Sequence, residues 1–181
     1  MMSHVQPSAE NAPEPLFSCP IFEINEREQI GRSGCAHKRY VIRHPGGVGI
    51  LPILPDGRVL LIQQYRAALD RRIYEIPAGT REPNEEPVVT AARELAEETG
   101  YRAETFTKLP SFYSSPGFLT EKVHIFAATG LTRGESALED GEDLSLYPVE
   151  LATAMKMIEN GEIEDGKTLV ALLAYRLMRE K

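Results

Sequence analysis

Two long apolar runs lie close together in the first half of the chain. Residues 47–54 and 58–65 are almost continuously apolar, and the triplet Pro55-Asp56-Gly57 separates them. Proline presets φ for a turn and glycine accepts a positive φ, so the pattern predicts a β-hairpin. Strands that lack alternating polar positions are typical of a buried sheet. We therefore expect both strands in the core.

The N-terminal part of the chain has a weaker pattern. Residues 1–15 are polar and proline-rich, which favours a flexible tail. Short strand-like stretches follow at 21–24 and 38–43, with Gly31 and Gly34 marking a turn between them. We expect a tail over 1–15, a small β segment over 16–44 and the main domain over 45–181.

The main domain mixes predicted strands with predicted helices. Strands are expected over 72–77, 121–128 and 144–149, the last at a sheet edge because Pro148 cannot donate a ladder hydrogen bond. Helices are expected over 150–159 and 168–179, and the second has five large apolar residues, Leu169, Leu172, Leu173, Leu177 and Met178. This pattern alone leaves both the α/β and the α+β class open.

A further helix is predicted directly after the strand at 72–77. Asn84 is the expected N-cap, Pro87 suits the first turn, where its missing N–H is harmless, and Gly100 suits the end. On the opposite side of this helix from its acidic residues lies an apolar stripe, made of Val88, Ala92, Leu95 and Thr99.

Three carboxylates share one face of this helix. Glu94, Glu97 and Glu98 are spaced i, i+3 and i+4, and like charges at this spacing destabilise a helix by about 0.2–0.5 kcal/mol per pair. One interpretation is a solvated acidic surface, which is common. The other is a site for Mg²⁺ or Mn²⁺, which prefer oxygen ligands.

The spacing of residues around the helix favours the metal site. It runs Gly, five residues, Glu, seven residues, Arg-Glu, an aliphatic residue, one residue, Glu-Glu, one residue and Gly, and the matching positions are Gly79, Glu85, Arg93, Glu94, Leu95, Glu97, Glu98 and Gly100. Tyr101 departs from the pattern, which usually ends on an aliphatic residue. With these eight positions the chain resembles the Nudix hydrolases.

This resemblance implies a fold and a metal site. The implied fold is an α/β/α sandwich with a mixed sheet. The implied ligands are Glu94 and Glu98 first, then Glu97 through a bridging ion or water, and the carbonyl of Ala78, with Glu82 near enough to assist. Glu97 is therefore also a candidate for the chemistry. Arg93 and Glu85 are expected to form a structural pair.

Further stretches resemble the ADP-ribose pyrophosphatase branch of the family: Gln63–Arg66, Glu75–Gly79, the triplet Ser115, Pro116 and Gly117, and the late segment 161–168. Pro116 lies 16 residues after Gly100, as in that branch. The same likeness implies a general base in the acidic loop 139–143, where Glu142 aligns best; an ordinary solvated loop is the alternative.

The residues expected to bind substrate follow from the same likeness. Ser115, Pro116 and Gly117 are candidates. Arg66 ends a buried strand, where its planar fork suits a phosphate, although a solvated strand end fits equally well. The branch also implies a homodimer in which the segment 16–44 is the candidate dimerisation element and helps to bind adenosine, with Phe17, Phe22 and Tyr40 as candidates.

Composition limits the partners. The 181 residues have a formal net charge of −7, which argues against a nucleic-acid partner. No apolar run is long enough to span a membrane, and Cys19 and Cys35 form no disulfide framework, so we expect a cytoplasmic protein without a membrane partner.

We therefore predict a Mg²⁺-dependent enzyme, with Mn²⁺ as the other metal, that hydrolyses ADP-ribose to AMP and ribose 5-phosphate. One alternative is a hydrolase of nucleotide sugars such as GDP-mannose. An alternative of another class is a non-catalytic Nudix module that senses a nucleotide. Such modules usually lose the glutamates that are present here.

Overall fold

The computed structural model describes residues 14–134 and 143–180. The chain divides into two compact units, each with its own sheet structure. Of the described residues, 14–45 and 115–121 form the first unit, and 46–114, 122–134 and 143–180 form the second. Glu142 and most of the acidic loop 139–143 therefore lie outside the described residues, as does most of the tail predicted over 1–15.

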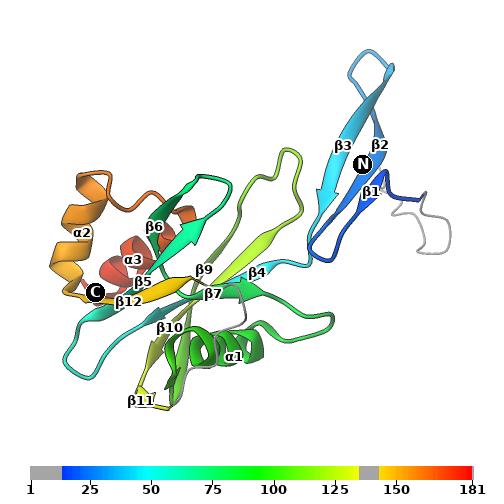
Figure 1. Cartoon of the computed structure of the whole chain (residues 1–181). Coiled ribbons are helices and arrows are strands. Elements are labelled where there is room, and N and C mark those ends of the chain that lie inside the picture. Colours follow the sequence, from blue (N-terminus) through cyan, green and yellow to red (C-terminus); the bar gives the residue numbers. More distant parts are fainter. Residues whose placement is uncertain (1–13, 135–142, 181) are drawn as a thin grey trace. The chain divides into compact units, whose positions relative to one another are not determined.

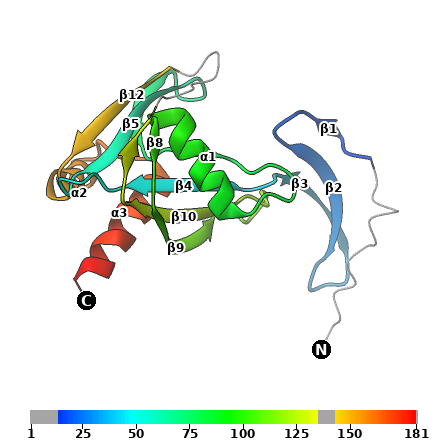
Figure 2. The same cartoon turned by 90° about the horizontal axis from the view of Figure 1, so that it is seen from below.

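The first unit is an antiparallel sheet of three strands, β1 (Phe17–Ser18), β2 (Glu23–Ile30) and β3 (Ala36–Arg43). Strands β2 and β3 form a long hairpin with β1 at the edge of β2 (Figure 2). Gly34 has a φ of 80° in the connecting turn, as its position in the sequence predicts. The predicted N-terminal sheet is therefore present.

Residues 115–121 belong to the first unit because they bond to its third strand. The Ile42 amide donates to the Phe118 carbonyl at 2.7 Å, and the Thr120 amide donates to the Ile42 carbonyl at 3.0 Å. The segment that contains Ser115, Pro116 and Gly117 thus packs with residues that are more than seventy positions earlier in the chain.

In its described residues, the second unit contains two main sheets and three helices, which Figure 1 shows in the ribbon. A four-stranded sheet has the order β7 (Ala78–Thr80), β4 (Gly47–Pro52), β10 (Lys122–Thr129), β9 (Thr105–Tyr113), and a three-stranded sheet has the order β12 (Leu144–Val149), β5 (Val59–Arg66), β6 (Arg71–Glu75). A small ribbon pairs β8 (Tyr101–Arg102) with β11 (Thr132–Arg133). The helices are α1 (Pro87–Thr99), α2 (Leu151–Glu159) and α3 (Gly166–Arg179).

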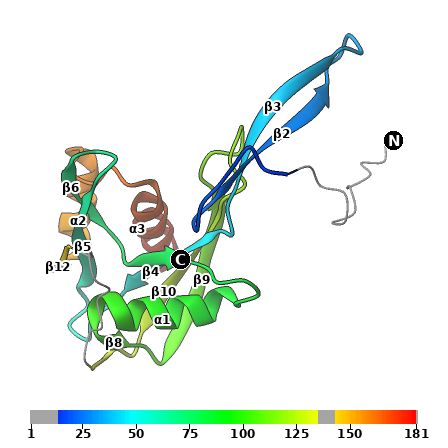
Figure 3. The ribbon, with the colours of Figure 1, turned by 45° about the vertical axis from the view of Figure 1, so that its right-hand side comes forward.

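Strand β4 lies in the middle of the core. It pairs in parallel with β10 and antiparallel with β7, so the sheet is mixed, as predicted. Val48 and Ile50 of β4 belong to the cluster that packs under α1, whereas Leu51 belongs to the cluster that contains α3 residues. Figure 3 shows α1 and α3 on opposite sides of this sheet. The predicted α/β class is confirmed.

The hairpin predicted from the two apolar runs is wrong. The turn itself forms, since the Gly57 amide donates to the Leu54 carbonyl at 2.9 Å and Gly57 has a φ of 87°. Beyond the single bridge between Ile53 and Val59, however, β4 and β5 separate into different sheets. Residues 47–52 and 59–62 are buried as expected, but β4 pairs with β10 and β7, whereas β5 pairs with β12 and with its neighbour β6.

Two details of α3 and β12 also bear on the predictions. Strand β12 lies at the edge of its sheet, as Pro148 predicts. The apolar set predicted for α3 is partly wrong: Leu173, Leu177 and Met178 are exposed, and the buried residues are Thr168, Ala171, Leu172 and Tyr175. In the part of the chain that is described, no helix has the length and apolar character to cross a membrane.

Candidate active site

Helix α1 begins later than the sequence indicates. Its N-cap is Glu86, so the prediction of Asn84 as the N-cap is wrong. Asn84 instead has a φ of 63° in a turn where the Glu85 amide donates to the Glu82 carbonyl at 3.1 Å. Asparagine tolerates this left-handed backbone better than most residues, which explains its place here. Pro87 opens the helix and Gly100, with a φ of 71°, ends it, as predicted.

The buried face of α1 matches the predicted apolar stripe only in part, at Leu95 and Thr99. Val88 is 43% exposed and Ala92 is exposed too, whereas Ala91 and Leu95 are fully buried. The buried face also contains carboxylates, because its buried residues include Thr90, Glu94, Glu98 and Thr99. The three glutamates therefore do not share a solvated face. Two of them, Glu94 and Glu98, are directed into the protein, and burial of that kind calls for compensating partners.

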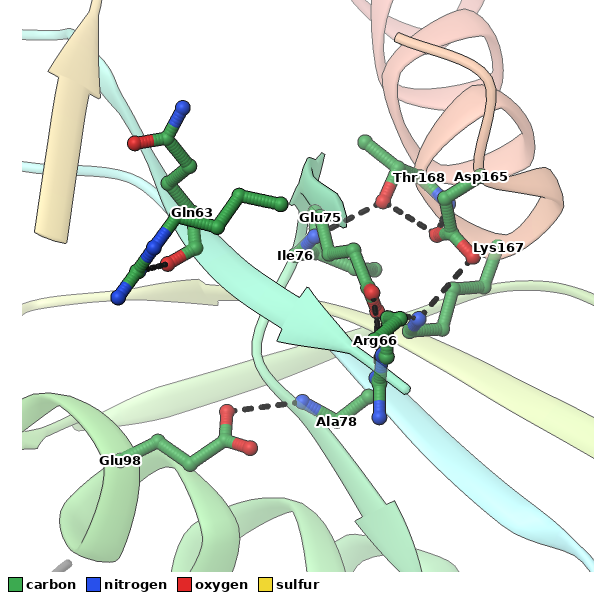
Figure 4. A network of polar contacts seen from close by, with 10 residues as sticks. Gln63, Arg66, Glu75, Ile76, Ala78, Glu98, Asp165, Lys167 and Thr168 are labelled. Carbon is green, nitrogen blue, oxygen red and sulfur yellow. Dashed lines mark hydrogen bonds and ion pairs between the residues drawn. The ribbon is translucent and has the colours of Figure 1, made fainter. Parts of the chain in front are cut away.

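Those partners come from the start of strand β7. The Ala78 amide donates to Oε2 of Glu98 at 3.1 Å (Figure 4). Gly79 leaves room for Glu94: a Cβ atom added to Gly79 would lie 1.8 Å from Oε1 of Glu94. A larger residue at this position would therefore displace the Glu94 carboxylate from the place it occupies here.

A polar pocket of about 330 Å³ lies between α1 and β7. Its lining residues are Ala78, Gly79, Thr80, Glu82, Arg93, Glu94 and Glu97. Five residues named as metal-site candidates from the sequence are Ala78, Glu82, Glu94, Glu97 and Glu98. The pocket brings together four of them, and Glu98 joins them through its bond to Ala78.

Arg93 balances the carboxylates of this pocket. Its Nη1 atom lies 2.8 Å from Oε1 of Glu94 and 3.0 Å from Oε2 of Glu97. Its Nη2 atom donates to Oε2 of Glu85 at 3.3 Å and to the Thr80 carbonyl at 3.3 Å. The predicted pair between Arg93 and Glu85 is confirmed, and the same guanidinium also offsets the repulsion between two helix glutamates.

Glu85 is held as a carboxylate by several donors. The Arg93 guanidinium, the Glu82 amide at 3.1 Å and the Thr90 hydroxyl at 2.8 Å all bond to it. The bond from Arg93 is the main cause that lowers the pKa of Glu85 to about 2, with the Glu82 amide and the Thr90 hydroxyl adding to it against the opposing effect of burial. The folded protein therefore favours the ionised form of Glu85.

The donor atoms of the pocket fit a hard divalent cation. Among the described residues, no three His, Cys, Asp or Glu side chains are gathered closely enough to enclose a metal ion. Mg²⁺ does not need such a cage, since it usually keeps several waters and takes one or two carboxylates with substrate phosphates. Glu94 and Glu98, one helical turn apart with Glu94 at the pocket wall, supply that number of carboxylates.

Arg66, at the end of β5, forms a bidentate ion pair with Glu75, and its side chain is 40% exposed. Its Nε and Nη2 atoms donate to the two carboxylate oxygens of Glu75 at 2.6 and 2.7 Å (Figure 4). Burial raises the pKa of Glu75, but the bonds from Arg66 and the charge of Lys167 outweigh burial and lower it below the usual value. The sequence pattern gave no signal for this pairing, because the two residues lie on neighbouring strands.

The remaining site residues predicted from the sequence are described within the first unit. Ser115, Pro116 and Gly117 belong to the first unit, where the Ser115 carbonyl accepts bonds from the Phe118 and Leu119 amides. Of the adenosine candidates, the rings of Phe17 and Phe22 are tilted by 40° with their centroids 5.9 Å apart, and Tyr40 is exposed.

At the end of the acidic loop, the one described residue has partners of its own. The Asp143 carboxylate pairs with Arg72, and its carbonyl accepts a bond from the Tyr65 amide at 3.3 Å. Glu142, which lies outside the described residues, is thus joined in sequence to a residue fixed at the edge between β12 and β5.

Fold and pocket together define a class: an α/β protein with a carboxylate-rich pocket between a glycine-containing strand and an acidic helix. Comparison with known proteins identifies the family within that class. The model of the NUDIX domain matches residues 43–171, and the chain belongs to the NUDIX family.

Individual relatives agree with this assignment. The chain is 41% identical to the ADP-ribose pyrophosphatase of Bacillus subtilis (strain 168) over 92% of its own length and 91% of that protein. It is 37% identical to the GDP-mannose pyrophosphatase of Escherichia coli O1:K1 / APEC over 78% of both chains. A solved ADP compounds hydrolase superimposes with a TM-score of 0.79 at 23% identity, covering 99% of this chain and 97% of that one, which shows the shared fold.

Proposed function

We propose that the protein is a Mg²⁺-dependent hydrolase that converts ADP-ribose to AMP and ribose 5-phosphate. The observation that carries the proposal is the buried carboxylate pair Glu94 and Glu98, directed at the Ala78–Gly79 segment beside a polar pocket. The choice of ADP-ribose is supported by the Bacillus subtilis relative, which is named an ADP-ribose pyrophosphatase and is similar over almost the whole chain.

Residues in and beside the pocket would serve as ligands of the metal ion. Glu94 and Glu98 are the first ligands, Glu97 assists, and the Ala78 carbonyl completes the protein part of the set. Mg²⁺, or Mn²⁺ in its place, would neutralise diphosphate oxygens and lower the pKa of a bound water. Arg93 keeps Glu94 and Glu97 in position by bonding to both, and Glu85 fixes Arg93 in turn.

A general base is needed to take the proton from the attacking water. We assign this role to Glu142, with Glu97 as a further catalytic residue. Support for Glu142 comes from the acidic run in which it lies and from its neighbour Asp143, which is tied to the β5 strand that ends in Arg66.

Further residues are assigned to substrate binding. We assign the diphosphate to Arg66 and assign further contacts to Ser115, Pro116 and Gly117. We also infer a homodimer in which the first unit contributes to the adenosine site. The first unit has a pocket of about 840 Å³ whose lining includes Phe22, Arg27 and Arg43, and aromatic and cationic groups of this kind suit a nucleotide. Both cysteines are free, which agrees with a cytoplasmic location.

A second candidate substrate is GDP-mannose. It is favoured by the 37% identity to the Escherichia coli GDP-mannose pyrophosphatase. Both candidate substrates contain a diphosphate, which the pocket would recognise. They differ from each other in the base and in the sugar.

The test is a substrate panel with Mg²⁺ in water labelled with heavy oxygen. ADP-ribose is expected to give AMP and ribose 5-phosphate at the highest kcat/KM, and the position of the label identifies the attacked phosphorus. Glu98→Gln serves as the inactive control for traces of contaminating enzyme. A higher kcat/KM with GDP-mannose would reassign the substrate, and hydrolysis of neither would refute the proposal.

A further inference from the structure

Ion pairs and hydrogen bonds link the start of helix α3 to the ends of strands β5 and β6. The network links Arg66 at the end of β5, Glu75 at the end of β6, and three residues at the start of α3, Asp165, Lys167 and Thr168 (Figure 4). Its first and last members, Arg66 and Thr168, are 102 positions apart in the sequence. None of the three residues at the start of α3 lines the pocket that contains Glu94 and Glu97.

One edge of the Arg66 guanidinium is fixed by this network. Nε and Nη2 bond to Glu75, whose side chain is 1% exposed, while the Arg66 side chain is 40% exposed. Within the described part of the chain, Nη1 of Arg66 forms no hydrogen bond. A bidentate bond to a buried carboxylate restrains the planar fork, so its remaining donors have a defined direction.

Glu75 is in turn held by Lys167. The ammonium group of Lys167 bonds to Oε2 of Glu75 and, at 3.1 Å, to Oδ1 of Asp165. Two cations and two carboxylates therefore balance in a largely buried space, where the side chain of Lys167 is 15% exposed and that of Asp165 is 17% exposed. A buried charge that loses one partner is strongly destabilised, so Lys167 determines whether Glu75 can hold Arg66 in place.

The same turn of α3 fixes the segment that leads to the metal ligands. Asp165 caps α3 by accepting a bond from the Thr168 amide at 2.9 Å, and the Thr168 hydroxyl accepts a bond from the Ile76 amide at 2.8 Å. Two residues after Ile76, the Ala78 amide donates to Glu98. The charge of Glu98 contributes to the raised pKa of Arg66, after the bond to Glu75, so the two groups act on each other electrostatically.

We propose that Lys167 and Glu75 are positioning residues that hold the Arg66 guanidinium by one edge and direct its other edge to the diphosphate of the substrate. This inference rests on the proposed function and deepens it. It assigns recognition of the diphosphate to Arg66 of β5, held in place by Glu75 of β6 and Lys167 of α3. Arg66 is the group that contacts the substrate, and Lys167 acts through Glu75 and Arg66.

A double-mutant cycle tests this order of action. Binding of inorganic pyrophosphate, the charged part common to both candidate substrates, is measured by calorimetry for wild type, Arg66→Met, Lys167→Met and the double variant. Losing one charge-assisted contact should weaken binding about tenfold or more in Arg66→Met. Lys167→Met should weaken binding severalfold, and it should have no further effect once Arg66 is gone. In kinetics with ADP-ribose, Lys167→Met should raise KM and leave kcat nearly unchanged.

Controls separate positioning from loss of fold. Lys156→Met removes an exposed lysine from α2 and should bind pyrophosphate as wild type does. If Lys167→Met does not fold, Lys167→Gln is used in the same cycle, since its amide can still donate to Glu75 while the charge is removed. Wild-type binding by the lysine variant, or additive losses in the double variant, would overturn the inference. A failure of this inference would leave the proposed function standing, because the proposed function is tested by whether wild type hydrolyses ADP-ribose.

Discussion

Gly79 and Glu94 are in such close contact that the carboxylate occupies the space of a missing side chain. A Cβ atom on Gly79 would lie 1.8 Å from Oε1 and 1.9 Å from Cδ of Glu94. The two residues are 15 positions apart in the sequence, one on strand β7 and one on helix α1. This contact explains physically why the motif begins with a glycine.

The first prediction follows from this contact. Gly79→Ala should displace the Glu94 carboxylate and lower kcat about 100-fold, because small misplacements of a reacting group have effects of that size. The fold should be retained, since Glu94 can move into the adjoining pocket. Gly166→Ala is the matched control, because a Cβ atom there meets nothing within 4 Å. Activity is measured with ADP-ribose at saturating Mg²⁺, and wild-type kcat in Gly79→Ala would show that Glu94 is not needed where it lies.

The second prediction concerns Glu98. Glu98→Gln keeps an oxygen that can accept the bond from the Ala78 amide, but it removes a charged metal ligand. We expect kcat to fall roughly 100-fold or more, by analogy with the loss of groups that orient metal ligands, with an unchanged circular dichroism spectrum. Glu159→Gln, at an exposed position on α2, is the control. An unchanged kcat at saturating Mg²⁺ would refute the metal-site proposal.

Much of the local structure could be predicted from the sequence. Gly100 ends α1, Gly34 turns the N-terminal hairpin and Pro148 marks an edge strand, because each depends on the backbone geometry of one residue. The Arg93–Glu85 pair was accessible through the motif. The family and its α/β fold followed from the same fixed spacing.

What could not be predicted depends on long-range pairing. The turn at Gly57 forms, but β4 pairs with β10 and not with β5, and no local pattern contains that information. In the same way, Ile76 bonds to Thr168 across 92 positions. The buried position of Glu94 and Glu98 was missed because hydrophobic patterning places carboxylates on the solvated face unless partners are known.

The third prediction concerns the base. Glu142→Gln should lower kcat about 100- to 10,000-fold, the range for a general base, and leave the affinity for ADP-ribose nearly unchanged. Single-turnover kinetics separates the chemical step from binding. Glu139→Gln, in the same acidic loop, is the comparison. If Glu142→Gln instead abolished binding and left the chemical step intact, the base would have to be sought among other residues.

The last prediction links Glu85 to the stability of the protein at low pH. Its pKa is about 2 in the folded protein against an ordinary value of 4.5, so the folded state favours the carboxylate. The contribution to stability is therefore fully present above about pH 4.5 and disappears as the pH falls through about 2. Glu85→Gln should cost about 1–3 kcal/mol at pH 7, since it weakens charge-assisted bonds from Arg93 and the Glu82 amide.

Urea unfolding of wild type and Glu85→Gln across this pH range provides the measurement. The difference in unfolding free energy should be constant from pH 7 to about 5 and should shrink as the pH falls from 4.5 towards 2. Glu159→Gln, which removes an exposed carboxylate from the end of α2, corrects for the general effect of charge on acid stability. A difference between Glu85→Gln and wild type that persists unchanged down to pH 2 would mean that the stabilisation by Glu85 does not depend on its ionised state. The Arg93 bonds would then have to be explained by shape and packing, and the proposal that Glu85 fixes Arg93 by charge would be abandoned.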